Sequence, residues 1–228
     1  MWQVEYGDIP AEYFVWLDES SVDDRTNQRN RGWADLGCAC VRRATFIQGQ
    51  CHSILPALTA DGFIALDILE GSVNKDRFLQ FLNDNLVCTK LLMISGSFPI
   101  LKLIHKAPKL NPYPGVWSVV VMDNCAIHHD EEVRAIVEGE CGMYCCSHLL
   151  ICTNLATDAK LIYLPPYSPD FNPIEQAFHS VKTWLWRHEA EAVLPKACPW
   201  LIQQAAMSIT VADAEGWIIN SGYSFMEG

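Results

Sequence analysis

Short apolar runs separated by polar turns recur along this chain and predict the strands of a sheet. The run that ends in Asp18 is typical of a buried strand that delivers a carboxylate at its C-terminal end. An Asp61-Gly62 pair between two later runs is a tight-turn signal, so we expect the first strands to form an antiparallel meander. The predicted strands are residues 13–17, 45–50, 51–58, 63–69, 119–122 and 161–164.

Helices are expected where apolar residues recur every three or four positions. One follows Asn74 as N-cap, one covers residues 130–138, and a final one covers 201–209. Between 165 and 173, four prolines form a stiff connector, after which Asn172 as N-cap and Pro173 at the first position open a further helix. Its apolar face holds Ile174, Ala177, Phe178, Val181, Trp184 and Leu185.

A chain of 228 residues is long enough for one large α/β domain, and because 50% of it is apolar we expect a folded globular protein. Neither a secretory signal nor an apolar run of membrane-spanning length is evident, so we expect a soluble intracellular protein with its ten cysteines reduced. The formal net charge of −11 gives no support to nucleic-acid binding, because it repels a phosphate backbone.

Three carboxylates stand at the ends of predicted elements. Asp18 and Asp123 follow buried strands, and Glu175 lies in the first turn of a helix. Phosphodiester cleavage uses two divalent cations roughly 3.5–4 Å apart, and carboxylates are the hard oxygen ligands that Mg²⁺ prefers. The alternatives are structural: an aspartate after a strand is commonly a turn former, and Glu175 with Asn172 could form only a capping box.

The sequence around these residues closely resembles the three blocks of mariner-like DDE-superfamily transposases. The blocks are residues 15–20, 121–129 and 164–175, and the third, Leu-Pro-Pro-Tyr-Ser-Pro-Asp-Phe-Asn-Pro-Ile-Glu, is the most specific. Shorter matches over 55–58, 61–62, 70–74, 111–115 and 217–223 extend the likeness along nearly the whole chain.

That resemblance implies an α/β RNase H-like fold with a mixed five-stranded sheet flanked by helices. It implies Asp18, Asp123 and Glu175 as catalytic metal ligands for Mg²⁺ or Mn²⁺, with two ions when DNA is bound. The implied reaction is endonucleolytic cleavage and strand transfer in DNA transposition, acting on transposon ends and target DNA. A homodimer on DNA, a nuclear location and no membrane association are expected with it. Family members carry a helix-turn-helix region before this domain, which we expect to be absent here.

Several residues are candidates for DNA contact. The stretch after Asp18 is the most basic part of the chain, although a solvated face would look the same because acidic residues lie within it. In the second block, Asn124 and either His128 or His129 could orient a carboxylate or contact DNA, and a structural histidine is the alternative. The basic candidates are Arg25, Arg29, Arg31, Arg42 and Arg43.

Other functions compete with transposition. The chain could be a catalytically inactive transposon relic or a host-recruited DNA-binding protein, or an RNase H-type nuclease that acts on RNA–DNA hybrids. A zinc cluster of Cys38, Cys40, Cys51 and His52 is disfavoured by its spacing, and buried thiols are expected instead.

Two segments do not resemble the family, about 88–107 and 142–158. We hypothesise that both are translated introns. Gly142-Met143-Tyr144 permits a donor-like GTATGT and Thr153-Asn154-Leu155 a branch-like CTAAC, and Val87-Cys88 permits a similar GTATGY at the first segment. Genuine surface insertions are the alternative, because loops tolerate added length at small entropic cost. Reads of mature transcript that cross both segments without gaps would refute the intron hypothesis.

Deleting residues 88–107 and 142–158 should raise the soluble yield of the expressed protein. Both segments are apolar, and apolar surface of this kind favours aggregation. The measurement is the soluble fraction of full-length and deleted chains after expression under the same conditions. Equal soluble fractions would count against the prediction.

Overall fold

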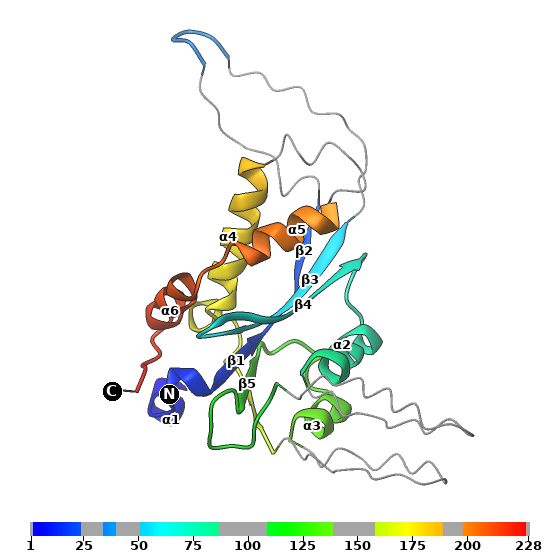
Figure 1. The fold of residues 1–228 in the computed structure, drawn as a ribbon, viewed down its shortest axis with the longest axis vertical. Helices are drawn as coiled ribbons and strands as arrows, with labels where there is room; N and C mark the ends of the chain where they lie inside the picture. The colour runs from blue at the N-terminus through cyan, green and yellow to red at the C-terminus, as the bar shows by residue number, and fades with distance from the viewer. Residues whose placement is uncertain are drawn as a thin grey trace, which may run out of the picture.

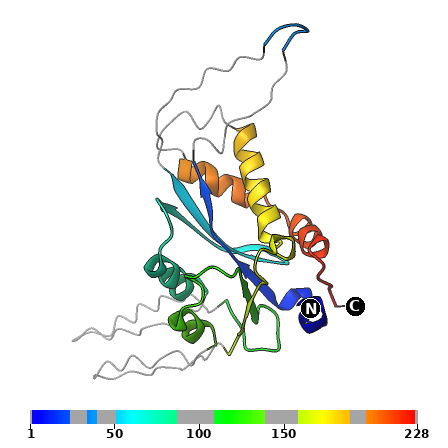
Figure 2. The same cartoon turned by 180° about the vertical axis from the view of Figure 1, so that it is seen from behind.

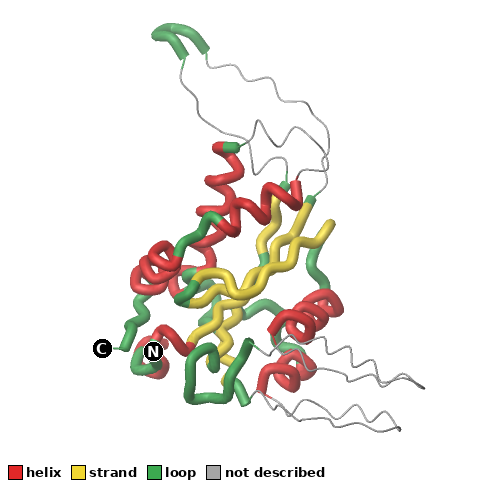
Figure 3. The backbone as a smooth tube through the Cα atoms, viewed as in Figure 1, coloured by secondary structure: helices red, strands yellow, loops and turns green. Residues whose placement is uncertain are grey.

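The computed structural model describes residues 2–23, 34–39, 51–86, 109–138, 158–188 and 198–226. Its strands form one mixed sheet, seen as a single yellow layer in Figure 3. The strands are β1 (Phe14–Leu17), β2 (Ser20–Val22), β3 (His52–Thr59), β4 (Gly62–Glu70), β5 (Val119–Met122) and β6 (Lys160–Tyr163).

Strands β1, β5 and β6 run parallel to one another, whereas β3 is antiparallel to β1, β2 and β4. Strand β2 continues β1 after a break at Asp18 and Glu19, and both pair with β3, which pairs with β4 along its full length. The sheet therefore has five positions, as expected, with one of them shared by β1 and β2. The predicted tight turn is confirmed, with Gly62 at a φ of +96°.

Helices cover both faces of this sheet. α4, α5 and α6 lie on one side, and α2 and α3 on the other (Figure 1). Seen from behind, α4 runs along the sheet with α5 and α6 beside it (Figure 2). The helices are α1 (Trp2–Tyr6), α2 (Lys75–Phe81), α3 (Glu131–Glu138), α4 (Ile174–Arg187), α5 (Cys198–Met207) and α6 (Val211–Asn220), with short helical turns η1 (Ala11–Tyr13), η2 (Leu82–Leu86) and η3 (Pro169–Phe171).

Alternation along β1 divides its side chains between two cores. Phe14 and Trp16 pack with the α4–α6 layer, while Val15 and Leu17 pack with the α2–α3 layer. All four are fully buried, which is why the strand reads as a continuous apolar run. The same division holds in β5.

The C-terminal segment returns to the start of β1. The ring of Tyr223 lies 5.0 Å from that of Phe14 and 5.1 Å from that of Trp16, and its hydroxyl donates to the Phe171 carbonyl oxygen at 2.8 Å. The Ala11 amide donates to the Ser224 carbonyl oxygen at 2.8 Å. This segment therefore fixes the connector that leads into α4.

Several sequence-based expectations need correction. The expected final helix at 201–209 is followed by α6, which begins with a capping box between Thr210 and Asp213. The short strand β2, which was not predicted, lies between Asp18 and the polar stretch of residues 23–43, and helix α1 precedes the first predicted strand. The prediction of buried thiols is wrong for Cys38 and Cys51, which are exposed.

Some expected features fall outside the described residues. These are the strand at 45–50, Cys40, the five candidate arginines, the segment 88–107, and 142–158 apart from Asp158. Within the described part of the chain, no helix is long and apolar enough to cross a membrane.

Candidate active site at the strand ends

Asp18 and Asp123 follow two neighbouring parallel strands in the same register. Leu17 of β1 pairs with Met122 of β5, so the next residue of each chain segment is an aspartate at the same edge of the sheet. Adjacent strands lie about 4.8 Å apart. Continuing the alternation of both strands directs the two side chains toward the face covered by α4. The register thus brings together two carboxylates more than a hundred residues apart.

Asp18 is the most buried of the three carboxylates, with 8% of its surface exposed. Its Oδ1 accepts the Glu19 amide at 2.8 Å, and its Oδ2 accepts the Asn172 side-chain amide at 2.9 Å. Burial, followed by repulsion from Asp123 and Glu175, raises the pKa of Asp18 to about 7. The carboxyl group of Asp18 therefore lies close enough to Asp123 and Glu175 for their negative charges to affect it.

Glu175 reaches the same region from α4. The stiff connector and η3 lead into the helix, whose first turn holds Glu175 as an exposed side chain. Asn172 was expected to cap this helix, but no side-chain cap is formed, and its amide instead donates to Asp18. The capping-box interpretation of Glu175 is therefore wrong. Asn172 ties the start of α4 to the end of β1.

Asp123 is held by a different partner. His128 Nδ1 lies 2.6 Å from its Oδ1, and the Cys125 amide donates to the same oxygen at 3.1 Å. The hydrogen bond from His128 is the largest of the effects that lower the pKa of Asp123. Its side chain is 45% exposed, so Asp123 is both charged and open to solvent.

His128 lies between two carboxylates. Its Nε2 is 3.1 Å from Oε2 of Glu19, and the ring is 0% exposed. Burial lowers the pKa of His128, but hydrogen bonds and charge from Asp123 and Glu19 outweigh it and raise the pKa to about 10. A fully buried ring has no surface to offer to DNA, so its position suits the orienting role. Neighbouring His129 hydrogen-bonds Asn124 and stacks on Tyr163.

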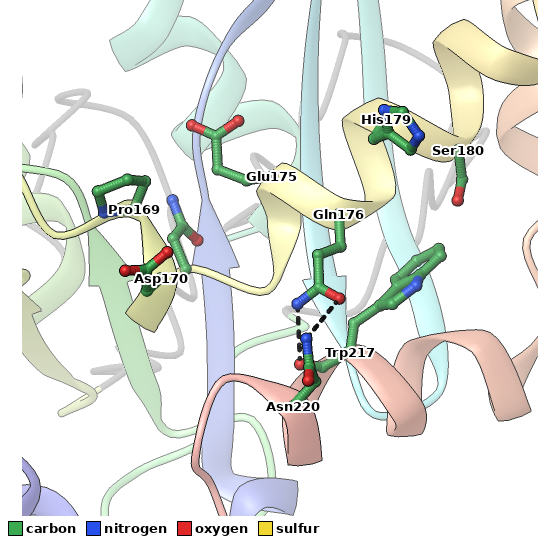
Figure 4. Close-up of a pocket in the computed structure, with 9 residues that line it drawn as sticks. Pro169, Asp170, Glu175, Gln176, His179, Ser180, Trp217 and Asn220 are labelled. Carbon is green, nitrogen blue, oxygen red and sulfur yellow. Dashed lines mark hydrogen bonds between the residues drawn. The ribbon is translucent and has the colours of Figure 1, made fainter.

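A groove of about 580 Å³ lies beside Glu175, between the start of α4 and α6. Figure 4 shows Glu175 and Gln176 leaving α4 on different sides, with Gln176 directed toward α6. The Gln176 amide donates to Ser221 Oγ at 3.3 Å and its oxygen accepts from Asn220 at 3.1 Å. Helix α6 thus anchors the residue next to Glu175.

The donor set suits a hard divalent cation. It comprises three carboxylates, one of which, Asp18, has a pKa raised by burial and then by repulsion from the other two. Oδ1 of Asn172 adds a buried oxygen with no hydrogen-bond partner among the described residues. As the side chains of the described residues stand, no three of His, Cys, Asp and Glu are grouped closely enough to hold a metal ion. Chemistry and topology therefore fit such an ion, whereas a closed coordination sphere requires side-chain movement.

Comparison with known proteins identifies the family of this chain. The family model for the DDE superfamily endonuclease matches residues 13–194. The chain belongs to the DDE superfamily of endonucleases. In this DDE endonuclease, all three carboxylates fall inside the matched region. No curated protein sequence matches the chain.

Solved structures similar to this DDE endonuclease include those of Mos1 transposase. The Mos1 strand transfer complex has a TM-score of 0.51 and 15% identity, with 92% of this chain and 51% of that chain covered. The Mos1 catalytic domain with Raltegravir and Mg gives a TM-score of 0.47 and 13% identity, over 98% of this chain and 90% of that chain. The first likeness confirms the RNase H-like fold, and the DDE endonuclease chain spans about half the length of that relative.

Sequence reasoning missed two residues of this site. Glu19 belongs to the first family-like block without a role of its own, and Asn172 is predicted only as a helix cap. A carboxylate directly after Asp18 and a side-chain amide three residues before Glu175 were the available signals. Neither signal reveals a contact with Asp18 or His128, because both contacts span more than a hundred residues.

Asp18→Asn should stabilise the metal-free protein at pH 8. The folded-state pKa of about 7 lies above the unfolded value of about 4. The folded chain thus binds this proton more tightly, and stability falls as pH rises between these values and stays low at pH 8. Each pKa unit corresponds to about 1.4 kcal/mol, and a weakened hydrogen bond offsets part of the gain. We expect the free energy of unfolding to rise by roughly 1–3 kcal/mol.

Urea denaturation in EDTA measures this gain. Asp61→Asn is the matched control, because Asp61 lies in the exposed β3–β4 turn beyond Thr59, whereas Asp18 lies beside the middle of β3. It should leave the free energy of unfolding within about 0.5 kcal/mol of wild type. Equal stabilities of wild type and Asp18→Asn would contradict the burial of Asp18 beside the charges of Asp123 and Glu175.

Proposed function

We propose that this chain is the catalytic domain of a mariner-like DDE transposase that cleaves transposon-end DNA and joins it to target DNA. The observation that carries the proposal is the pairing of Leu17 with Met122, which sets Asp18 and Asp123 side by side beneath the helix that bears Glu175. Family membership supports the nuclease chemistry, and the fold likeness to a Mos1 strand transfer complex supports the joining reaction.

Asp18, Asp123 and Glu175 would hold Mg²⁺ or Mn²⁺ in this proposal. Two such ions would activate the oxygen that attacks the phosphate and stabilise the oxygen that leaves it. The carboxylates bring the negative charge that attracts the ions, and Asn172 keeps Asp18 turned toward α4. Glu175 and Asp123 remain open to solvent, where a phosphate could approach.

The acidic character of the chain is compatible with DNA as the substrate. The net charge of −11 repels the phosphates of DNA. Cations held by the three carboxylates would make the local charge at the active site positive. The five arginines after Asp18, together with Asn124, remain the candidates for contact with the DNA backbone. A homodimer on DNA and a nuclear location belong to the same proposal.

Supercoiled plasmid with Mg²⁺ or Mn²⁺ tests the reaction. The full chain should nick it, and Asp123→Asn or Glu175→Gln should each lower the rate by roughly 100-fold or more, because each removes a charged ligand worth several kcal/mol in the transition state. Asp61→Asn should nick at the wild-type rate. Gel separation of nicked from supercoiled plasmid gives the rates.

The outcomes separate the competing functions. Nicking that survives both substitutions would place the activity elsewhere or in a contaminant. Folded protein without divalent-dependent nicking would indicate an inactive relic. Faster cleavage of an RNA–DNA hybrid than of duplex DNA would indicate an RNase H-type nuclease.

A further inference from the structure

The environment of His128 is unusual for a histidine in a protein core. The ring is fully buried, yet each nitrogen faces a carboxylate oxygen, Asp123 at 2.6 Å and Glu19 at 3.1 Å. A carboxylate can only accept a hydrogen bond, so both nitrogens donate only when the ring carries two protons. The ring is then a buried cation that bridges the residues following β1 and β5.

Packing fixes this ring in place. Phe78 of α2 lies against it, with ring centroids 4.7 Å apart. The backbone of His128 is held by the Tyr163 hydroxyl, which donates to its carbonyl oxygen at 2.7 Å, and by its own amide, which donates to Cys125 at 3.0 Å. Contacts from α2, β6 and the loop after β5 thus determine where the two ring nitrogens lie.

The consequence falls on Asp123. Among the described residues, both hydrogen bonds to Asp123, from His128 and from the Cys125 amide, go to Oδ1. Oδ2 receives neither, so the rotation of the carboxylate is set by two donors on one oxygen. An aspartate that is 45% exposed would otherwise rotate freely in solvent.

We infer that His128, backed by Glu19, is the positioning residue that presents Oδ2 of Asp123 to the catalytic cations. The inference rests on the proposed function, because it assumes that Asp123 is a metal ligand. Hydrogen-bonded partners behind metal ligands orient them, and their loss lowers metal affinity by about 10–100-fold. Glu19 completes the arrangement by holding Nε2, which leaves Nδ1 directed at Asp123.

Two neutral substitutions distinguish positioning from charge. In His128→Asn the side-chain NH₂ can occupy the place of Nδ1 and still donate to Asp123. In His128→Gln the longer side chain places its amide near Nε2, so the bond to Asp123 is lost. Both remove the same positive charge, which on electrostatic grounds alone would strengthen cation binding in both.

Manganese chloride is the probe. Binding is measured by electron paramagnetic resonance of free Mn²⁺ without DNA, and the Mn²⁺ concentration for half-maximal plasmid nicking is measured in parallel. We expect His128→Gln to weaken binding about 10–100-fold, and His128→Asn to recover most of that loss. His188→Asn and His188→Gln are the matched controls, because His188 lies at the far end of α4 from Glu175, where it stacks on Trp184, and both should bind as wild type.

A second variant covers the case in which the His128 substitutions do not fold. Glu19→Gln keeps an oxygen that can accept from Nε2, whereas Glu19→Ala leaves Nε2 without a partner. Glu19→Ala should weaken Mn²⁺ binding more than Glu19→Gln does. Circular dichroism and urea unfolding establish which variants are folded.

The results separate this inference from the proposed function. The positioning role would be overturned if His128→Gln bound Mn²⁺ as tightly as His128→Asn or more tightly. It would equally be overturned if Glu19→Ala bound Mn²⁺ as tightly as Glu19→Gln or more tightly. If Asp123→Asn itself leaves Mn²⁺ binding and nicking unchanged, the proposed function fails instead. Loss of binding in Asp123→Asn with the expected order among the His128 variants supports both.

Discussion

The parallel pairing of β1 with β5 is the constraint on which the site depends. Each strand is buried on both faces, so its register is fixed by two cores at once, and a shift by one residue would exchange every side chain between them. The two strands end at the same edge with Asp18 and Asp123. Hydrophobic burial of the two strands therefore holds Asp18 and Asp123 close together although their carboxylates repel each other.

Concentrating carboxylates at this edge has an electrostatic cost, which the structure distributes unevenly. Asp18 is buried and carries a pKa of about 7, whereas the pKa of Asp123 is lowered by the imidazolium of His128. Glu175 stays exposed, where water screens its charge. Carboxylates that repel one another in the absence of cations favour cation binding, because a bound cation relieves that repulsion.

Anchoring of α4 shows how distant segments serve the same edge. Asn172 ties the start of the helix to β1, while Gln176 ties its first turns to α6. Sequence patterns predicted α4 well, since its apolar face repeats at helical spacing, but α6 and β2 were missed. Helix α6 has a mixed apolar pattern, and β2 covers only Ser20–Val22, too short for alternation to be visible.

The sequence by itself determined the strands that deliver Asp18 and Asp123, the helix that delivers Glu175 and the family to which the chain belongs, because these depend on local patterns and short motifs. Tertiary structure decided the contacts within the site. Asn172 donates to Asp18 and does not cap its helix, and His128 lies between Glu19 and Asp123. Both arrangements depend on the register of the sheet and the packing of α4. Those are contacts between residues distant in sequence, and no local pattern encodes them.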